Sequence, residues 1–188
     1  MASSYGDDSP IAAFATTPGW SALSLIRCSG NASLELAANV FSAPKKLLLA
    51  AGNTILHGWI VNGEKGKGSR VDEVLISVFR GPKSYTGEDS LDISCHGGIA
   101  AGRGVMAALR AAGFRDALPG EFTFRAFMNG KLDLTRSESV IELVSAKTDK
   151  GRCNAVDRLS GALENEINGV KNLLVQALSA SEIYLDYS

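Results

Sequence analysis

Three charged residues stand at separate points of the sequence where their neighbours give them a defined position: Arg27, Asp92 and Lys131. Arg27 belongs to a strand-like run, Leu23–Cys28, whose alternation places it on the same face as two leucines. A guanidinium in that setting needs an acidic or carbonyl partner. A structural ion pair and a bound ligand would both meet this need, so both interpretations stay open for Arg27.

Asp92 lies in a second strand-like run, Ser90–Cys95. Alternation puts Asp92 and Ser94 on the polar face of this run and the apolar side chains on the other face. A residue that lines a pocket needs such a face. The alternation therefore gives Asp92 a position on the polar face of its strand.

Lys131 belongs to the stretch Pro119–Leu134, which divides the chain into an earlier part with strands and a later part without them. The pair Asn129-Gly130 suits the left-handed cap at the carboxyl end of a short helix, because both residue types tolerate a positive φ. Lys131 then follows a helix end directly. A packed hinge with a solvated lysine is the alternative interpretation.

Other chemistry finds little support in the sequence. The chain has two histidines, and the adjacent pair Cys95-His96 has no further clustered ligands, so we predict no metal site. The three cysteines form no CxxC motif, which argues against a disulfide framework or a thiolate zinc site. The glycine-rich segment 63–69 lacks the lysine before serine of a phosphate loop, and we interpret it as a flexible loop. We predict no catalytic residue.

Composition limits the class of protein. The chain has 188 residues, 45% of them hydrophobic and 21% charged, as in an ordinary globular protein. The net charge of −1 argues against a broad nucleic-acid-binding face, and hence against a stand-alone nucleic-acid-binding module. No apolar run approaches the roughly 20 residues of a membrane span, and no secretory signal is visible. We therefore expect a cytoplasmic protein without membrane contact.

The elements that must position these residues follow from the apolar pattern. After a flexible tail at residues 1–9, we expect short strands and two helices up to the stretch that begins at Pro119. The expected strands cover residues 11–15, 23–28, 53–61, 71–79, 90–95 and 114–118, and the expected helices cover residues 33–41 and 99–112.

The remainder of the chain has helical periodicity only. Thr135-x-x-Glu138 has the spacing of a capping box and predicts a helix up to about Lys147. We expect one longer helix after Thr148, with apolar residues at intervals of three and four. This apolar stripe needs a cover, either from a second subunit or from sequence that these residues lack.

Four motifs now make the sequence recognisable by their order and spacing. Together they resemble the MnmE (also called TrmE) family of tRNA-modification GTPases, and Ile26–Gly30 looks like the Ile-Arg-x-Ser-Gly strand end of that family. The resemblance covers residues 10 to 186. The motifs are Pro82-Lys83-Ser84-Tyr85-Thr86-Gly87-Glu88-Asp89, His96-Gly97-Gly98, Pro119-Gly120-Glu121-Phe122 and Asn129-Gly130-Lys131-Leu132-Asp133-Leu134.

The resemblance implies an α+β fold. Residues 10–131 would form a mixed β-sheet with packed helices, like folate-binding aminomethyltransferase domains, and residues 132–188 would form an all-α segment with a long helix. In the family a GTPase domain interrupts the helical domain, and it would bind GTP, magnesium and potassium. The motifs of that GTPase domain are absent from these 188 residues. We therefore expect the 188 residues to be the amino-terminal portion of a longer product, and we expect this portion not to hydrolyse GTP by itself.

The resemblance also implies a function. Members of the family form homodimers through the amino-terminal domain and bind a one-carbon tetrahydrofolate, such as the 5-formyl or methylene form, near the dimer interface. With the flavoprotein MnmG they place an aminomethyl or carboxymethylaminomethyl group on the wobble uridine of certain tRNAs.

Carried over by motif, the folate contacts of the family fall on Arg27, Asp92 and Lys131. A carboxylate can accept the N–H edge of a pterin bidentately, and Arg and Lys suit its oxygen atoms. Two positions depart from the family: Asp92 stands where a longer Glu is typical, and Gly19-Trp20-Ser21-Ala22 replaces Gly-Arg-Gly-Gly. A dimerisation scaffold of the same fold that has lost folate binding is therefore the alternative hypothesis.

Overall fold

The computed structural model describes residues 7–63 and 68–187. It divides into two compact units, Met1–Lys131 and Leu132–Ser188, and each unit is considered by itself. The tail expected at residues 1–9 and the flexible loop expected at 63–69 fall largely outside the described residues. Asp7 and Ser9 are described, and their carbonyl oxygens accept hydrogen bonds from Arg125 at 2.9 and 2.8 Å.

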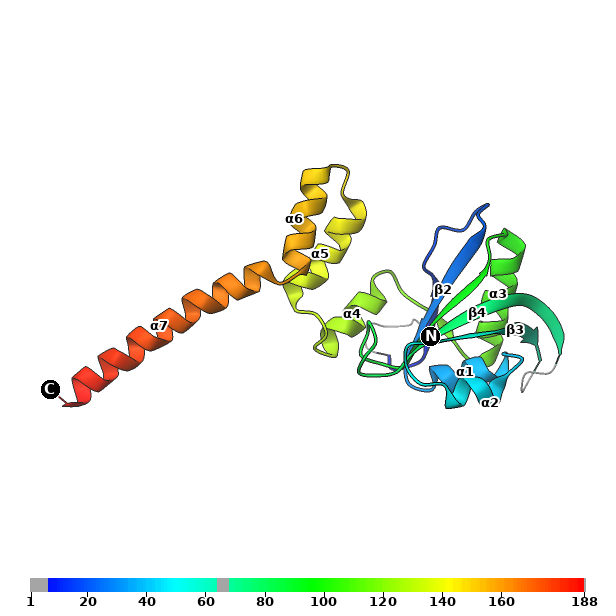
Figure 1. The fold of residues 1–188 in the computed structure, drawn as a ribbon, viewed down its shortest axis with the longest axis horizontal. Helices are drawn as coiled ribbons and strands as arrows, with labels where there is room; N and C mark the ends of the chain where they lie inside the picture. The colour runs from blue at the N-terminus through cyan, green and yellow to red at the C-terminus, as the bar shows by residue number, and fades with distance from the viewer. Residues whose placement is uncertain (1–6, 64–67, 188) are drawn as a thin grey trace. The chain divides into compact units, whose positions relative to one another are not determined.

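Unit 1 is built on a six-stranded mixed sheet in the order β3-β4-β5-β2-β1-β6. Figure 1 labels β2, β3 and β4 of this sheet. All neighbouring strands are antiparallel except β1 and β6, which are parallel. The α+β fold predicted from the sequence is thereby confirmed. The strands are β1 Ile11–Phe14, β2 Leu23–Ser29, β3 Thr54–Asn62, β4 Ser69–Phe79, β5 Ser90–His96 and β6 Arg115–Asp116.

Helices cover one face of this sheet and form the core of unit 1 with it. They are α1 Ser33–Asn39, α2 Pro44–Leu49 and α3 Ile99–Ala112. The apolar side chains on alternate positions of β2, β4 and β5 point into this core, as a half-buried strand requires. The sequence pattern did not predict α2, because six residues are too short to display a helical period.

The other face of the sheet is more exposed and mixes polar with apolar side chains. Leu23, Ile55 and Leu75 on this face are 63%, 67% and 47% exposed. The register places Arg27 of β2 directly opposite Asp92 of β5 on the same face. We call this surface the open face of the sheet, and it carries two of the three predicted site residues.

Helix α4, Glu121–Met128, lies in unit 1 and ends in the cap that the sequence predicts. Gly130 has a φ of 68°. The backbone N–H of Gly130 donates to Phe127 and that of Lys131 donates to Ala126, the pair of bonds of a Schellman motif. Lys131 therefore has a defined backbone position.

Unit 2 comprises α5 Leu134–Ser145, α6 Asp149–Leu159 and α7 Ala162–Tyr187. Two predictions made here were wrong. The N-cap of α5 is Asp133, which accepts from the Arg136 backbone N–H at 2.8 Å, and not Thr135. The single long helix is broken at Gly161, whose φ of 84° lies in the left-handed region.

Helix α7 leaves its apolar residues exposed within the described part of the chain. Ile167, Val170 and Leu174 are 57%, 59% and 66% exposed. The apolar stripe predicted from the sequence thus exists and lacks a cover among the described residues. Within those same residues, the helices are too short or too polar to cross a bilayer.

Candidate ligand-binding site

Arg27 and Asp92 form a bidentate ion pair across the two central strands of the open face. Arg27 Nε and Nη2 donate to the two carboxylate oxygens of Asp92, both at 2.8 Å. The side chains are 34% and 14% exposed. The hydrogen bond to Asp92 raises the pKa of Arg27, so the guanidinium remains charged. The sequence predicts an acidic or carbonyl partner for Arg27, and in the structure this partner is the carboxylate of Asp92.

This ion pair borders a small cavity of about 150 Å³. The aromatic ring of Tyr85 covers the pair on one side, with its centroid 5.6 Å from Arg27 Cζ. Pockets for whole drug-sized ligands measure about 300–1,000 Å³. The cavity therefore has room for one end of such a molecule. It is lined by Arg27, Phe79, Tyr85, Thr86, Ser90 and Asp92.

Lys131 does not line this cavity. Its Nζ donates to the carbonyl oxygen of Pro82 at 2.9 Å. Pro82 belongs to the loop Arg80–Asp89, which also supplies Tyr85 and Thr86 to the cavity. The structure thus brings Arg27 and Asp92 together and places Lys131 against the loop that forms a wall of their cavity.

A buried group of hydroxyl side chains supports the same wall. Thr86 Oγ1 lies 2.6 Å from Ser29 Oγ, and Ser90 Oγ lies 3.2 Å from the same atom. Ser29 also donates to Glu88 at 2.8 Å. Sequence reasoning missed this group because its members come from two distant segments and are small polar residues without a spacing pattern.

A buried ionic cluster joins α4 to the rest of unit 1. Glu121 is 1% exposed and binds Arg115 at 2.6 Å and Arg125 at 3.1 Å. Burial raises the pKa of Glu121, but the hydrogen bonds from Arg115, the Leu118 N–H and Arg125 outweigh it and lower the pKa to about 2. Arg125 also contacts Glu88 at 3.3 Å. The i,i+4 spacing of Glu121 and Arg125 was the signal that could have revealed part of this cluster.

The adjacent Cys95 and His96 have different surroundings. His96 Nδ1 lies 2.6 Å from the carboxylate of Asp72, which is nearly buried, and Cys95 is buried as a free thiol. Burial raises the pKa of Cys95 to about 11, which keeps it protonated. Over the residues that the structure describes, we find no cluster of three His, Cys, Asp or Glu side chains able to hold a metal ion.

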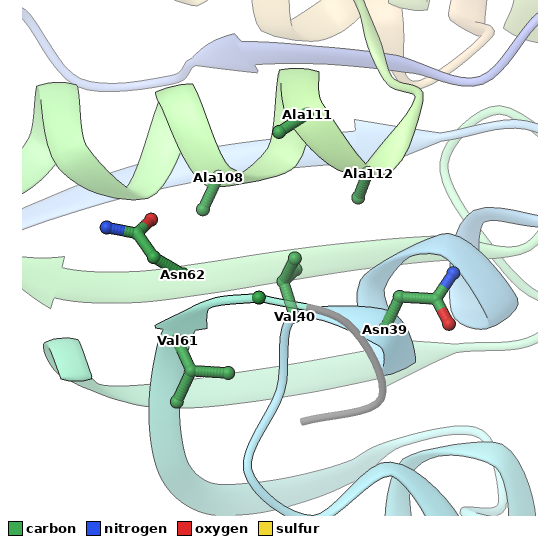
Figure 2. Close-up of a pocket in the computed structure, with 8 residues that line it drawn as sticks. Asn39, Val40, Val61, Asn62, Ala108, Ala111 and Ala112 are labelled. Carbon is green, nitrogen blue, oxygen red and sulfur yellow. The ribbon is translucent and has the colours of Figure 1, made fainter. Parts of the chain in front are cut away.

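A second, larger cavity of about 550 Å³ lies where α3 meets the ends of α1 and β3 (Figure 2). Alanines of α3 form one side of it. Its described lining contains no ionisable side chain and none of the three predicted site residues. The smaller cavity is therefore the better candidate for a charged or strongly polar ligand. The larger one is lined by Asn39, Val40, Val61, Asn62, Gly63, Ala108, Ala111 and Ala112.

Comparison with known proteins adds independent evidence. The family described as "GTP-binding protein TrmE N-terminus" matches residues 10–131. The tRNA modification GTPase MnmE of Treponema denticola is 48% identical over 184 residues, which cover 98% of this chain and 38% of that protein. The proteins of the same name from Borrelia recurrentis and Protochlamydia amoebophila are each 42% identical, over 100% and 97% of this chain.

The matches cover nearly the whole of this chain but less than half of each relative. The chain spans only 38% to 40% of the length of these three relatives. The family match ends at Lys131, the last residue of unit 1. Identity above 40% across nearly the whole chain, together with a family match over most of it, leads to one conclusion: the chain belongs to the TrmE N-terminus family, the family of the amino-terminal part of MnmE tRNA-modification GTPases.

Proposed function

We propose that unit 1 binds a one-carbon tetrahydrofolate, such as the 5-formyl form, at the cavity beside Arg27 and Asp92. The observation that carries this proposal is the bidentate ion pair at the edge of a cavity on the open face. The pair presents a carboxylate and a guanidinium side by side. A pterin edge offers adjacent N–H donors for the carboxylate and an oxygen atom for the guanidinium.

The size of the cavity suggests how such a ligand would lie. A volume of about 150 Å³ holds a bicyclic head group and leaves the rest of a folate outside. Lys131, which lies on the far side of the loop Arg80–Asp89, would then meet only a part of the ligand that extends beyond the cavity. Its exposed ammonium suits a carboxylate of the folate tail.

Homodimerisation through the open face is the second part of the proposal. Leu23, Ile55 and Leu75 leave large apolar side chains exposed on that face. Large apolar side chains exposed on a sheet face favour burial against a partner. A second copy that packs there would also shield the ion pair of Arg27 and Asp92 from water.

The remaining activities belong to the longer proteins of the family. We propose that the chain is the amino-terminal portion of a cytoplasmic tRNA-modification GTPase. In that protein a separate domain binds GTP, magnesium and potassium, and MnmG cooperates in the modification of the tRNA wobble uridine. The relatives are named as tRNA modification GTPases, which supports this proposal.

A thermal unfolding experiment tests the ligand directly. Addition of 5-formyltetrahydrofolate should raise the melting temperature of the chain, because a ligand that binds only the folded state stabilises it by mass action. Light scattering on the same samples reports the oligomeric state. If the chain is a dimer and its melting temperature does not change with the ligand at millimolar concentration, the result would favour the alternative, a scaffold that has lost folate binding.

A further inference from the structure

We infer that the loop Arg80–Asp89 couples the ligand cavity to the segment Asn129–Lys131, and that Asn129 is a positioning residue for ligand binding. This inference rests on the folate-binding function proposed above. Asn129 does not line the cavity. It acts through Thr86, a cavity residue whose backbone it holds.

One side of the loop faces the cavity. Tyr85 covers the guanidinium of Arg27, and Thr86 is 1% exposed with its hydroxyl 2.6 Å from that of Ser29. These two residues supply one wall of the cavity. A change of a few tenths of an ångström in their backbone therefore changes the space beside the ion pair.

The other side of the same loop is held by the segment that follows α4. Asn129 Nδ2 donates to the carbonyl oxygen of Thr86 at 2.8 Å. A Cβ atom placed on Gly87, whose φ is 83°, would lie 3.1 Å from Asn129 Cβ and 3.3 Å from Lys131 Cγ, so the backbone and the two side chains are in close contact. Lys131 adds its hydrogen bond to Pro82 at 2.9 Å.

Helix α4 and the ends of the loop complete this support. Tyr85 Oη lies 3.0 Å from Thr123 Oγ1 on α4. At the base of the loop, Arg80 Nη1 donates to Asp89 at 3.0 Å. The loop is therefore clamped at its base and attached to α4 and Asn129 along its length, so that displacement of one attachment moves the cavity wall.

The physical consequence is a reciprocal coupling. A ligand that enters the cavity beside Arg27 contacts Tyr85, because both residues line that cavity and the ring of Tyr85 lies over the guanidinium. The shift passes through one peptide unit to the Thr86 carbonyl and hence to Asn129. If the state of the Asn129 contact affects ligand affinity, then ligand binding must affect that contact to the same extent.

Asn129→Ala in the full 188-residue chain tests the inference. We expect the Kd for 5-formyltetrahydrofolate to rise about 3- to 10-fold, the effect of one hydrogen bond to a part-buried carbonyl. Asn62→Ala, at an exposed asparagine of β3 beside the other cavity, is the matched control and should leave the Kd unchanged. A purely structural role for Asn129 would lower the melting temperature of the free chain and leave the Kd of the folded chain unaltered.

Two further readouts separate positioning from stability. The side-chain amide signal of Asn129 in an ¹⁵N NMR spectrum should shift when ligand is added, whereas that of Asn62 should not. Tyr85→Phe and Thr123→Val each remove the contact between the two hydroxyl groups. The double variant should then bind no more weakly than the more affected single variant, because both changes remove the same interaction.

The outcomes distinguish this inference from the proposed function. Absence of ligand binding by the natural chain would refute the proposed function and remove the basis of the coupling. Binding by the natural chain together with an unchanged Kd for Asn129→Ala and an unshifted Asn129 amide signal would overturn the coupling alone. An increased Kd with the amide shift would support both.

Discussion

Replacement of Asp92 by alanine removes the carboxylate that accepts both hydrogen bonds from Arg27. Exposed ion pairs contribute about 0.2–1 kcal/mol, and loss of one partner from a buried pair costs about 3–5 kcal/mol. The side chains of Arg27 and Asp92 are 34% and 14% exposed, so this pair is intermediate between an exposed and a buried ion pair. We therefore expect Asp92→Ala to lower the free energy of unfolding of unit 1 by about 1–2 kcal/mol.

Urea denaturation followed by tryptophan fluorescence measures this loss. Both tryptophans, Trp20 and Trp59, belong to unit 1, so their signal reports the unfolding of that unit. Asp116→Ala is the control, because its ion pair with Arg110 has side chains 58% and 53% exposed and should contribute less than about 1 kcal/mol. Equal losses in the two variants would show that the Arg27–Asp92 pair behaves as an ordinary surface pair.

The same variant also tests the ligand site. Asp92→Ala removes the carboxylate proposed as the acceptor for the pterin N–H edge, and a hydrogen bond to a charged group contributes about 1.5–3 kcal/mol. We therefore expect binding of 5-formyltetrahydrofolate to weaken by at least tenfold. Undiminished affinity in a folded Asp92→Ala chain would refute the assignment of Asp92 to the ligand.

Two further predictions follow from the titratable groups. Glu121→Gln should destabilise unit 1 by about 3 kcal/mol at neutral pH, because Glu121 is 1% exposed and loss of one partner from a buried ion pair costs about 3–5 kcal/mol. Hydrogen bonds from Arg115, the Leu118 N–H and Arg125 lower the pKa of Glu121 to about 2 despite its burial. This contribution is present above the unfolded pKa of about 4.5 and is lost as the pH falls toward 2, so denaturation curves of the two chains should converge in acid. The hydrogen bond to Asp72 raises the pKa of His96 above 6.5, which an NMR titration can measure. The stability contributed by the pair of His96 and Asp72 is complete below pH 6.5 and is lost as the pH rises through the raised pKa of His96. Asp72→Asn should abolish both the increase in the pKa of His96 and this pH-dependent stability.

The strands that carry the candidate site were predictable because alternation is a local property. The pattern in Leu23–Cys28 put Arg27 on the face that carries two leucines, and the pattern in Ser90–Cys95 put Asp92 on the polar face of its strand. It could not show that these two faces meet, because strand order and register depend on packing over 65 residues of separation. The cap at Gly130 was predictable for the same local reason, whereas the contact of Lys131 with Pro82 was not.

The errors in the helical unit arose where two local signals competed. Thr135 and Asp133 both suit an N-cap, and the structure uses Asp133, whose carboxylate also pairs with Arg136 at 3.2 Å. The apolar period continues through Gly161, so periodicity alone predicted one helix. A glycine within a helical pattern only weakens the prediction, and the left-handed φ of Gly161 is visible only in the structure.

The most direct test of the central claim is a calorimetric titration of the natural chain and of Asp92→Asn with 5-formyltetrahydrofolate. Asparagine keeps the size of the side chain but is neutral, and it offers one acceptor oxygen in place of the two carboxylate oxygens of Asp92. We predict saturable binding by the natural chain and markedly weaker binding by the variant. Absence of binding heat for the natural chain at millimolar ligand, or equal affinity of the two chains, would contradict the assignment of the Arg27–Asp92 cavity to a folate.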